Sequence, residues 1–376
     1  MALSEVLPRE SEYMSAALFQ PITIGNVSIR NRIWLPALCQ YSVPQLDGVP
    51  TDWQLVHLGA VAAGGAGLLF TEATAVTPDG RISDHDTGIW NDEQGSAWSP
   101  IVSFVQSQGA KIGVQLAHAG RKASTWADWN TTRTGSQPIA DGGWETVAPS
   151  ALAFPGLAAP RALAADEIPG IVTAFADAAE RAERAGFDVV EVHAAHGYLI
   201  HQFLSPLSNQ RSDEWGGSLE NRARLLREIV RAIRARVSLP IFVRFSATDW
   251  IDGGWDVPQT SQVTEWLMDD GADFFDISSG ALLPNARIPI GPNYQVPLAA
   301  EIHESTEAPV VAVGLITAAQ QAEEIVSSGK AQAVMLGRAM MRDPHWVLRA
   351  AHELGETIDY WPPQYRHAAL AQGRAW

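Results

Sequence analysis

The chain has 376 residues, of which 46% are hydrophobic and 18% charged, and this supply of apolar side chains excludes an intrinsically disordered protein. The formal charge of −16 makes the surface acidic, so nucleic acid is not an expected partner. Cys39 is the single cysteine, which excludes an intrachain disulfide and a multi-cysteine metal cage and fits a reducing compartment.

The N-terminal segment carries Glu5, Glu10 and Glu12 and has no long apolar run. It therefore has the features of neither a secretory signal nor a membrane span. We expect residues 1–17 to form a flexible extension of a soluble cytoplasmic protein that does not bind membranes.

From Ile33 onward, short apolar runs alternate with helical patterns. The expected strands are residues 33–35, 67–70, 111–114, 189–192, 241–243, 274–277, 310–313 and 333–336. The helices between them are expected at residues 51–63, 101–108, 168–185, 219–237 and 260–269, and a helical stretch also follows each later strand. Eight apolar strands alternating with helices predict a single (β/α)8 TIM barrel over residues 18–360. An open doubly wound sheet is the alternative, which is disfavoured because no G-x-G-x-x-G follows the first strand.

A long insertion, residues 121–165, separates the third strand from its helix. It is rich in turn-forming residues and contains Trp126, Trp129 and Trp144. Insertions of this length at a strand end are often active-site lids or subunit contacts, although a surface excursion without function is the alternative.

Barrel enzymes carry their active sites at the C-terminal ends of the strands, so the residues after each expected strand are the candidates. They are Cys39, Tyr41, Glu72, Ala73, Gln115, His118, His193, His196, Tyr198, Arg244, Ser278, Ser279, Gly280, Gly314, Gly337 and Arg338. After the last two strands, Gly314 and Gly337 allow close backbone approach and Arg338 offers a bidentate donor. These three residues predict a phosphate-bearing ligand.

The richest cluster is His193-Ala-Ala-His196-Gly-Tyr198. Two histidines three residues apart could ligate zinc, bind a carbonyl or anion, or be structural. A zinc site would need a third ligand such as His118 or Glu72, and no metal-hydrolase spacing accompanies the pair. Without a metal, two N–H donors beside a phenol suit enolate chemistry, in which charge develops on oxygen while a carbon receives hydride or a proton.

Arg244 ends an apolar strand and needs an anionic partner. Asp276 on the next strand is one candidate, and the electron-rich edge of a bound ring is the other. Gln115 offers a donor and an acceptor, which fits the imide edge of a pyrimidine-like ring. Together these residues suggest a flat heteroaromatic cofactor with a phosphate tail.

Several of these motifs resemble those of the old yellow enzyme family of FMN-dependent ene-reductases. The stretch from Glu191 to Pro206 carries the resemblance, together with Gln115 to Lys122 and the dipeptide Asp343-Pro344. The similarity extends from Leu18 to about Tyr365, which is more than nine-tenths of the chain.

The resemblance implies an FMN-binding barrel in which NADPH or NADH is the hydride donor and an activated alkene is the substrate: an enone, enal, maleimide or nitroalkene. His193 and His196 would hold the substrate oxygen, Tyr198 would protonate the α-carbon, and Tyr41 would be a further substrate contact. The residues implied to contact FMN are Pro36, Ala37, Leu38, Cys39, Ala73, Gln115, Arg244, Gly314, Gly337 and Arg338. A reductase of nitro compounds or nitrate esters with the same site is the alternative.

Departures from the family pattern concern the first strand and the tail. Pro36 is shifted relative to the cysteine, in the segment whose backbone would contact FMN. In the branch with this cysteine, a C-terminal arginine enters the neighbouring subunit, so Arg366 and Arg374 in the tail, residues 361–376, are candidates in a homodimer or homotetramer. Two further hypotheses are a barrel hydrolase using Glu72, Glu191 or Asp276, and a non-catalytic flavin carrier or ligand sensor.

Overall fold

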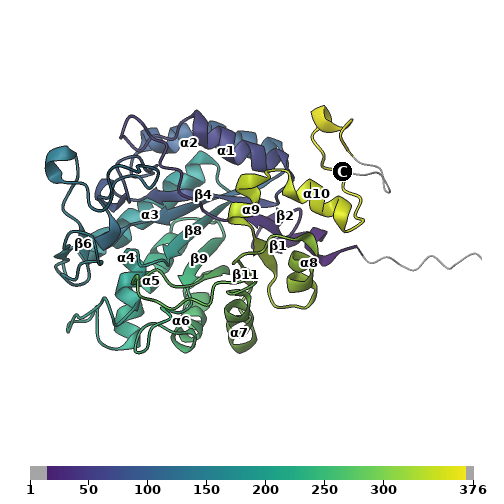
Figure 1. Cartoon of the computed structure of the whole chain (residues 1–376). Helices are drawn as coiled ribbons and strands as arrows, with labels where there is room; N and C mark the ends of the chain where they lie inside the picture. The colour runs from purple at the N-terminus through teal and green to yellow at the C-terminus, as the bar shows by residue number, and fades with distance from the viewer. Residues whose placement is uncertain (1–14, 370–376) are drawn as a thin grey trace, which may run out of the picture.

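The computed structural model describes residues 15–369, and a closed barrel of parallel strands forms its centre (Figure 1). The barrel strands are β3 (Ile33–Leu35), β4 (Leu68–Ala75), β5 (Lys111–Ala117), β8 (Val189–Ala194), β9 (Ile241–Ser246), β10 (Phe274–Ser278), β11 (Val310–Ala312) and β12 (Ala333–Met335). They follow one another around the ring in chain order, and β12 closes it by pairing with β3. The predicted (β/α)8 barrel is therefore confirmed, and the open doubly wound sheet is wrong.

Helices surround the barrel and cover the outer face of its strands (Figure 1). They are α1 (Asp52–Ala63), α2 (Asp92–Ser107), α3 (Ile168–Ala185), α4 (Leu199–Leu204), α5 (Leu219–Arg234), α6 (Val257–Asp270), α7 (Val296–Thr306), α8 (Ala319–Ser327), α9 (Gly337–Arg342) and α10 (Trp346–Glu353). The bounds of α3 agree with the prediction. Helix α2 begins well before the predicted residue 101, because the Asn91 side chain accepts from the Gln94 N–H at 2.9 Å and starts the helix there. No helix within residues 15–369 combines the length and the apolar character that a bilayer crossing requires.

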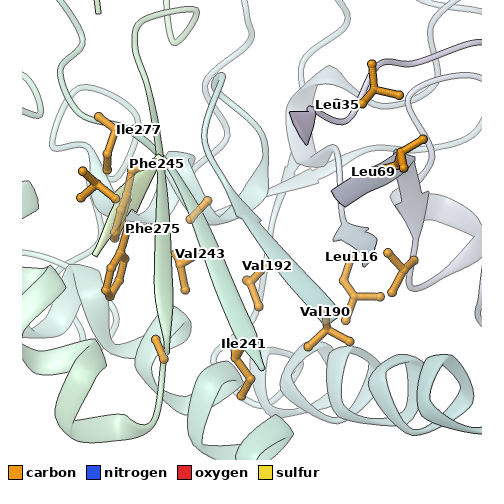
Figure 2. Close-up of a cluster of buried hydrophobic side chains, with 14 of the residues drawn as sticks. Leu35, Leu69, Leu116, Val190, Val192, Ile241, Val243, Phe245, Phe275 and Ile277 are labelled. Carbon is orange, nitrogen blue, oxygen red and sulfur yellow. The ribbon is translucent and has the colours of Figure 1, made fainter. Parts of the chain in front are cut away.

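The main hydrophobic core lies between the strands and the helices. Figure 2 shows side chains of this layer contributed by successive strands, among them Leu69, Leu116, Val192 and Val243. Because neighbouring residues of a strand point to opposite faces, the alternate residues of each strand point into the barrel. One face of each strand therefore packs against the helices, and the other face lines the barrel interior.

The lower part of the barrel interior is filled with aromatic side chains. Trp34, Phe242 and Phe274 pack with ring centroids 4.9 to 6.0 Å apart. A hairpin of β1 (Ile22–Ile24) and β2 (Val27–Ile29) packs its apolar side chains against this group. The sequence interpretation did not include this hairpin, although Gly25-Asn26 is a two-residue turn signal. Because aromatic side chains fill this end of the interior, we expect a ligand site at the opposite end, where the strands terminate.

Short elements lie in the segments that connect the barrel strands and helices. They are η1 (Ala17–Phe19), η2 (Pro78–Gly80), η3 (Gly120–Lys122), η4 (Ile139–Asp141), β6 (Val147–Ala148), β7 (Arg161–Ala162) and η5 (Pro363–Tyr365). Two tryptophans fasten the insertion to neighbouring loops: Trp129 Nε1 donates to the Tyr41 carbonyl at 3.0 Å, and Trp144 Nε1 donates to the Asp79 carbonyl at 2.8 Å. The insertion thus extends over the ends of β3 and β4.

Candidate active site

Four polar side chains form a layer directly above the aromatic floor of the barrel. Gln115 stands opposite Glu191 across β5 and β8, and Arg244 stands opposite Asp276 across β9 and β10. Gln115 Nε2 donates to Glu191 Oε1 at 2.7 Å, and Arg244 Nε lies 2.8 Å from Asp276 Oδ2. Asp276 is therefore the ionic partner that the sequence suggested for Arg244. Burial, reinforced by the charge of Asp276, raises the pKa of Glu191 above its usual value.

A cavity of about 240 Å³ opens beside this layer, at the ends of β11 and β12. Its lining includes Pro36, Leu38, Arg244, Tyr294, Gln295, Gly314, Leu315, Thr317, Gly337, Arg338 and Arg342. Gly314 has φ +126°, and a Cβ there would lie 3.1 Å from Gln295 Nε2. This position therefore requires glycine, and its backbone is open to a ligand. Arg338 and Arg342, which both line the cavity, make it suitable for an anion.

Of the cofactor contacts predicted from the sequence, Pro36, Leu38, Arg244, Gly314, Gly337 and Arg338 line this cavity. Ala37, Cys39, Ala73 and Gln115 lie outside its lining. Gln115 belongs to the polar layer, while Cys39 and Ala73 pack together closer to the insertion.

The two histidines and the tyrosine after β8 lie side by side. The rings of His193 and His196 are 5.2 Å apart between centroids, and those of His193 and Tyr198 are 5.1 Å apart. His196 Nε2 lies 2.7 Å from Ser278 Oγ. Burial, followed by the charge of Arg244, lowers the pKa of both imidazoles well below the usual value. Both are therefore neutral near pH 7, and each can offer one N–H to an oxygen.

Tyr198 is held as a protonated phenol. Burial raises its pKa well above the ordinary value, and Cys39, Asp86 and Asp128 add to the effect. The phenol hydrogen therefore stays on the oxygen over the whole physiological range, where it is available for donation.

The loop after β3 carries Cys39 and Tyr41 to the same region. Glu72 fixes this loop by accepting from the Gln40 N–H at 2.9 Å and the Tyr41 N–H at 3.3 Å, and its other oxygen accepts from Gln54 Nε2 at 2.8 Å. Burial raises the pKa of the Cys39 thiol to about 12, with Asp86 and Glu72 adding to the effect. Glu72 thus acts as a loop anchor, and Cys39 is a neutral thiol.

A second cavity, of about 250 Å³, lies between Tyr41, Tyr198 and the insertion. The insertion contributes Trp126, Asp128 and Arg133 to its wall. This arrangement makes the insertion part of the site wall, a role in line with the expected lid.

Behind the His196–Tyr198 turn, three buried side chains form a support that the sequence did not reveal. The Gly197 N–H donates to His201 Nδ1 at 2.9 Å, and His201 Nε2 lies 2.9 Å from Asp249 Oδ1. Asp249 Oδ2 in turn accepts from Ser205 Oγ at 2.7 Å. His201 and Asp249 are separated by almost fifty residues and share no motif, so only the folded chain brings them together.

Other residues missed as site candidates are Lys122, Gln295 and Glu72 in its anchoring role. Lys122 stands in the wall of the second cavity, and its presence in the Gln115–Lys122 motif was an available signal. Gln295 holds the ends of β10 and β11 by accepting from Ser279 Oγ at 2.7 Å and donating to the Val313 carbonyl at 3.2 Å, and nothing in the sequence marks it.

The two remaining predicted candidates lie in the tail. Arg366 is exposed beyond η5 and lines neither of the two cavities of its own chain, and Arg374 lies outside the described residues. His118, considered as a zinc ligand, accepts from the Gly120 N–H at 3.1 Å. Within residues 15–369, no three His, Cys, Asp or Glu side chains form a group that could hold a metal ion.

Comparisons with known proteins agree with this geometry. Residues 17–357 match the model of the NADH:flavin oxidoreductase / NADH oxidase family. The chain is 44% identical over 353 residues to an NADPH dehydrogenase of Geobacillus thermodenitrificans, covering 94% of this chain and 98% of the relative. The corresponding enzyme of Bacillus subtilis is also 44% identical, with 94% and 99% covered. Among solved structures, the old yellow enzyme homologue from Zymomonas mobilis superposes with a TM-score of 0.74 at 30% identity, covering 94% of this chain and 99% of the other.

Proposed function

Because this chain belongs to the NADH:flavin oxidoreductase / NADH oxidase family and is an old yellow enzyme-type oxidoreductase that uses FMN and a nicotinamide cofactor, we propose that it reduces the C=C bond of activated alkenes. The observation that carries the proposal is the placement of a protonated phenol, Tyr198, against two neutral imidazoles, His193 and His196. One group can give a proton to carbon while the other two hold the oxygen on which charge develops.

The chain's residues fit FMN. At Gly337 a Cβ would lie 3.2 Å from Leu38 Cδ2, and Gly314 is restricted to glycine, so the two positions leave backbone free beside Arg338. We infer that Gly314, Gly337 and Arg338 hold the phosphate, and that Arg244 and Gln115 face the ring. Pro36, Ala37, Leu38, Cys39 and Ala73 would complete its surroundings. When bound, FMN supplies the hydride chemistry of the reaction.

The protein's own residues polarise and protonate the substrate. His193 and His196 direct N–H donors at a carbonyl or nitro oxygen, which draws electron density away from the β-carbon. Tyr198 then gives its proton to the α-carbon, a general-acid step worth about 10²- to 10⁴-fold in rate. Tyr41 packs in the same cluster and would limit the size of the substrate.

The insertion and the tail complete the proposal. We assign the insertion, residues 121–165, the role of a lid because it walls the second cavity, and we expect NADPH or NADH to reduce the enzyme. Arg366 stands on the exposed surface, so a contact with a neighbouring subunit of a homodimer or homotetramer is open to it. We expect the enzyme to work in the cytoplasm on small molecules, with neither nucleic acid nor membrane as a partner.

The proton-donor role is tested by Tyr198→Phe in separate half-reactions. We expect reoxidation of the reduced enzyme by 2-cyclohexenone to slow by about 10²- to 10⁴-fold, while reduction by NADPH stays within a few-fold of the unchanged enzyme. Tyr360→Phe is the matched control, because Tyr360 lies away from the site against Arg30, 4.5 Å from its guanidinium carbon. Equal losses in both half-reactions would reject Tyr198 as the donor.

The alternative substrates are separated by a panel. Stopped-flow reoxidation is compared for enones, maleimides, nitroalkenes and nitrate esters. The proposal expects C=C reduction to give saturated products at the fastest rates. Fast turnover of nitrate esters with no reduction of alkenes would instead favour a nitro-compound or nitrate-ester reductase.

A further inference from the structure

Lys122 stands out because it is one of three lysines in the chain, with Lys111 and Lys330, and lines the second cavity beside Tyr41 and Tyr198. It follows β5 at the end of η3, where the insertion begins. The other lysines have ordinary surroundings: Lys111 pairs with Asp188 at 3.0 Å, and Lys330 is exposed. The position of Lys122 in the wall of the second cavity therefore needs an explanation of its own.

Two backbone carbonyls and two aromatic rings surround the Lys122 ammonium. Nζ donates to the His196 carbonyl at 2.8 Å and to the Ala281 carbonyl at 2.7 Å. It lies 4.6 Å from the ring centroid of Phe154 and 5.3 Å from that of Tyr198. Within residues 15–369, no carboxylate forms an ion pair with it, so its charge is not neutralised by an acid. The positive charge is thus directed at aromatic faces.

The Lys122 ammonium lies 5.3 Å from the centroid of the Tyr198 ring, and proton donation would leave an anion on this side chain. When Tyr198 gives up its proton, the phenolate forms in a buried place whose neighbours Cys39, Asp86 and Asp128 already disfavour negative charge. A positive charge close to the ring offsets part of that cost, because opposite charges interact strongly where water is excluded.

We propose that Lys122 is a positioning residue that stabilises the Tyr198 phenolate formed during substrate protonation. The O–H bond of Tyr198 breaks, a C–H bond forms at the α-carbon, and solvent later returns a proton to the phenolate oxygen. The hydrogen bond from Lys122 Nζ to the His196 carbonyl also fixes the turn that carries Tyr198. This inference rests on the proposed function, since it assigns Tyr198 the role of proton donor.

The geometry has a consequence for pH dependence. Burial, aided by Arg121, lowers the pKa of Lys122 to about 8, so the ammonium is present at pH 7 and is lost as the pH rises through 8. The other titratable and charged groups that face Lys122 or Tyr198 are Cys39, Tyr41, Asp86, Asp128, Arg133, His193 and His196. Burial raises the pKa of Asp86 to about 7 and lowers those of both histidines. Reoxidation by an enone should therefore slow above pH 8.

The test combines Lys122→Met and Lys122→Arg with Tyr198→Phe in the FMN-loaded enzyme. Lys122→Met should slow reoxidation by 2-cyclohexenone about tenfold, as expected for loss of a desolvated cation–π contact, and should abolish the decline above pH 8. Lys122→Arg keeps the charge and should retain most of the rate. In the Tyr198→Phe background, Lys122→Met should cause no further loss. Lys330→Met is the matched control and should leave the rate unchanged.

Each outcome decides between the claims. If Lys122→Met lowers the reoxidation rate equally with and without the Tyr198 hydroxyl, Lys122 has only a structural role and the inference is overturned. A normal rate in Lys122→Met with an impaired Tyr198→Phe enzyme would overturn the inference and leave the proposed function standing. A normal rate in Tyr198→Phe would instead overturn the proton-donor assignment itself.

A measurement without turnover covers the case in which Lys122→Met does not fold. Reductive methylation with ¹³C-formaldehyde labels the three lysines and the N-terminal amine for NMR titration of the intact protein. The Lys122 resonance, assigned by its loss in Lys122→Arg, should titrate near pH 8. A Lys122 resonance that is already that of a neutral amine at pH 7 would overturn the inference, because no cation would then stand beside Tyr198.

Discussion

Replacement of His201 by leucine should destabilise the protein, because it removes a hydrogen-bond partner of a fully buried carboxylate. The side chains of His201 and Asp249 are both 0% exposed. Leucine would leave Asp249 Oδ1 buried without this hydrogen bond, which typically costs about 1–3 kcal/mol, and more for a charged group. Asp249 Oδ2 still accepts from Ser205 Oγ and, at 2.8 Å, from the Trp255 N–H, so the acid cannot turn toward solvent without losing both bonds.

A double-mutant cycle isolates the pair. Asp249→Asn removes the charge, so His201→Leu combined with Asp249→Asn should cost about 1–3 kcal/mol less than the sum of the single changes. Urea unfolding followed by far-UV circular dichroism and tryptophan fluorescence gives the free energies of unfolding. Because the interaction with His201 holds the pKa of Asp249 below its ordinary value, its contribution is complete above the unfolded-state pKa of about 4 and is lost as the pH falls further. A cost below about 1 kcal/mol for His201→Leu, or additive effects in the cycle, would refute the reasoning.

The remaining predictions concern the cofactor cavity and the cysteine. Arg338→Ala should weaken FMN binding by about tenfold or more, measured by fluorescence titration of the apoprotein, because a charged hydrogen bond contributes about 1.5–3 kcal/mol; an unchanged Kd would place the phosphate elsewhere. Gly314→Ala should lower FMN retention as well, because a backbone φ of +126° is strained for a residue with a side chain and the new Cβ would contact Gln295. Full retention of FMN would contradict the assignment of Gly314 to the phosphate site. Alkylation of Cys39 by iodoacetamide, followed by mass spectrometry, should be slow at pH 7 and rise with pH toward 11, because the raised pKa of about 12 keeps the thiol neutral; a rate independent of pH would contradict this. Cys39→Ala should shift the FMN midpoint potential, and an unchanged potential would leave Cys39 a packing residue.

The sequence revealed those parts of the molecule that depend on local periodicity. Apolar residues recur at the helical period within residues 168–185, and the structure has a helix with the same bounds. Each barrel strand was visible because both of its faces are buried and its residues form a continuous apolar run. Local patterns also placed His193, His196 and Tyr198 together, since they follow a single strand.

Contacts between distant segments were not visible. The anchoring of the β3 loop by Glu72, the support of the Tyr198 turn by Asp249, and the placement of Lys122 against Tyr198 all join residues from different strands. Their side chains carry no periodic signal, because their positions depend on how the barrel closes. The start of α2 was missed for a local reason: the cap at Asn91 precedes a stretch with few apolar residues.

The measurement that tests the central claim most directly is an anaerobic titration of the purified protein. We expect a yellow protein whose visible flavin absorption is bleached by NADPH and restored by one equivalent of 2-cyclohexenone, with cyclohexanone as the product. A colourless protein that releases no FMN on denaturation and binds none when it is added would contradict the account.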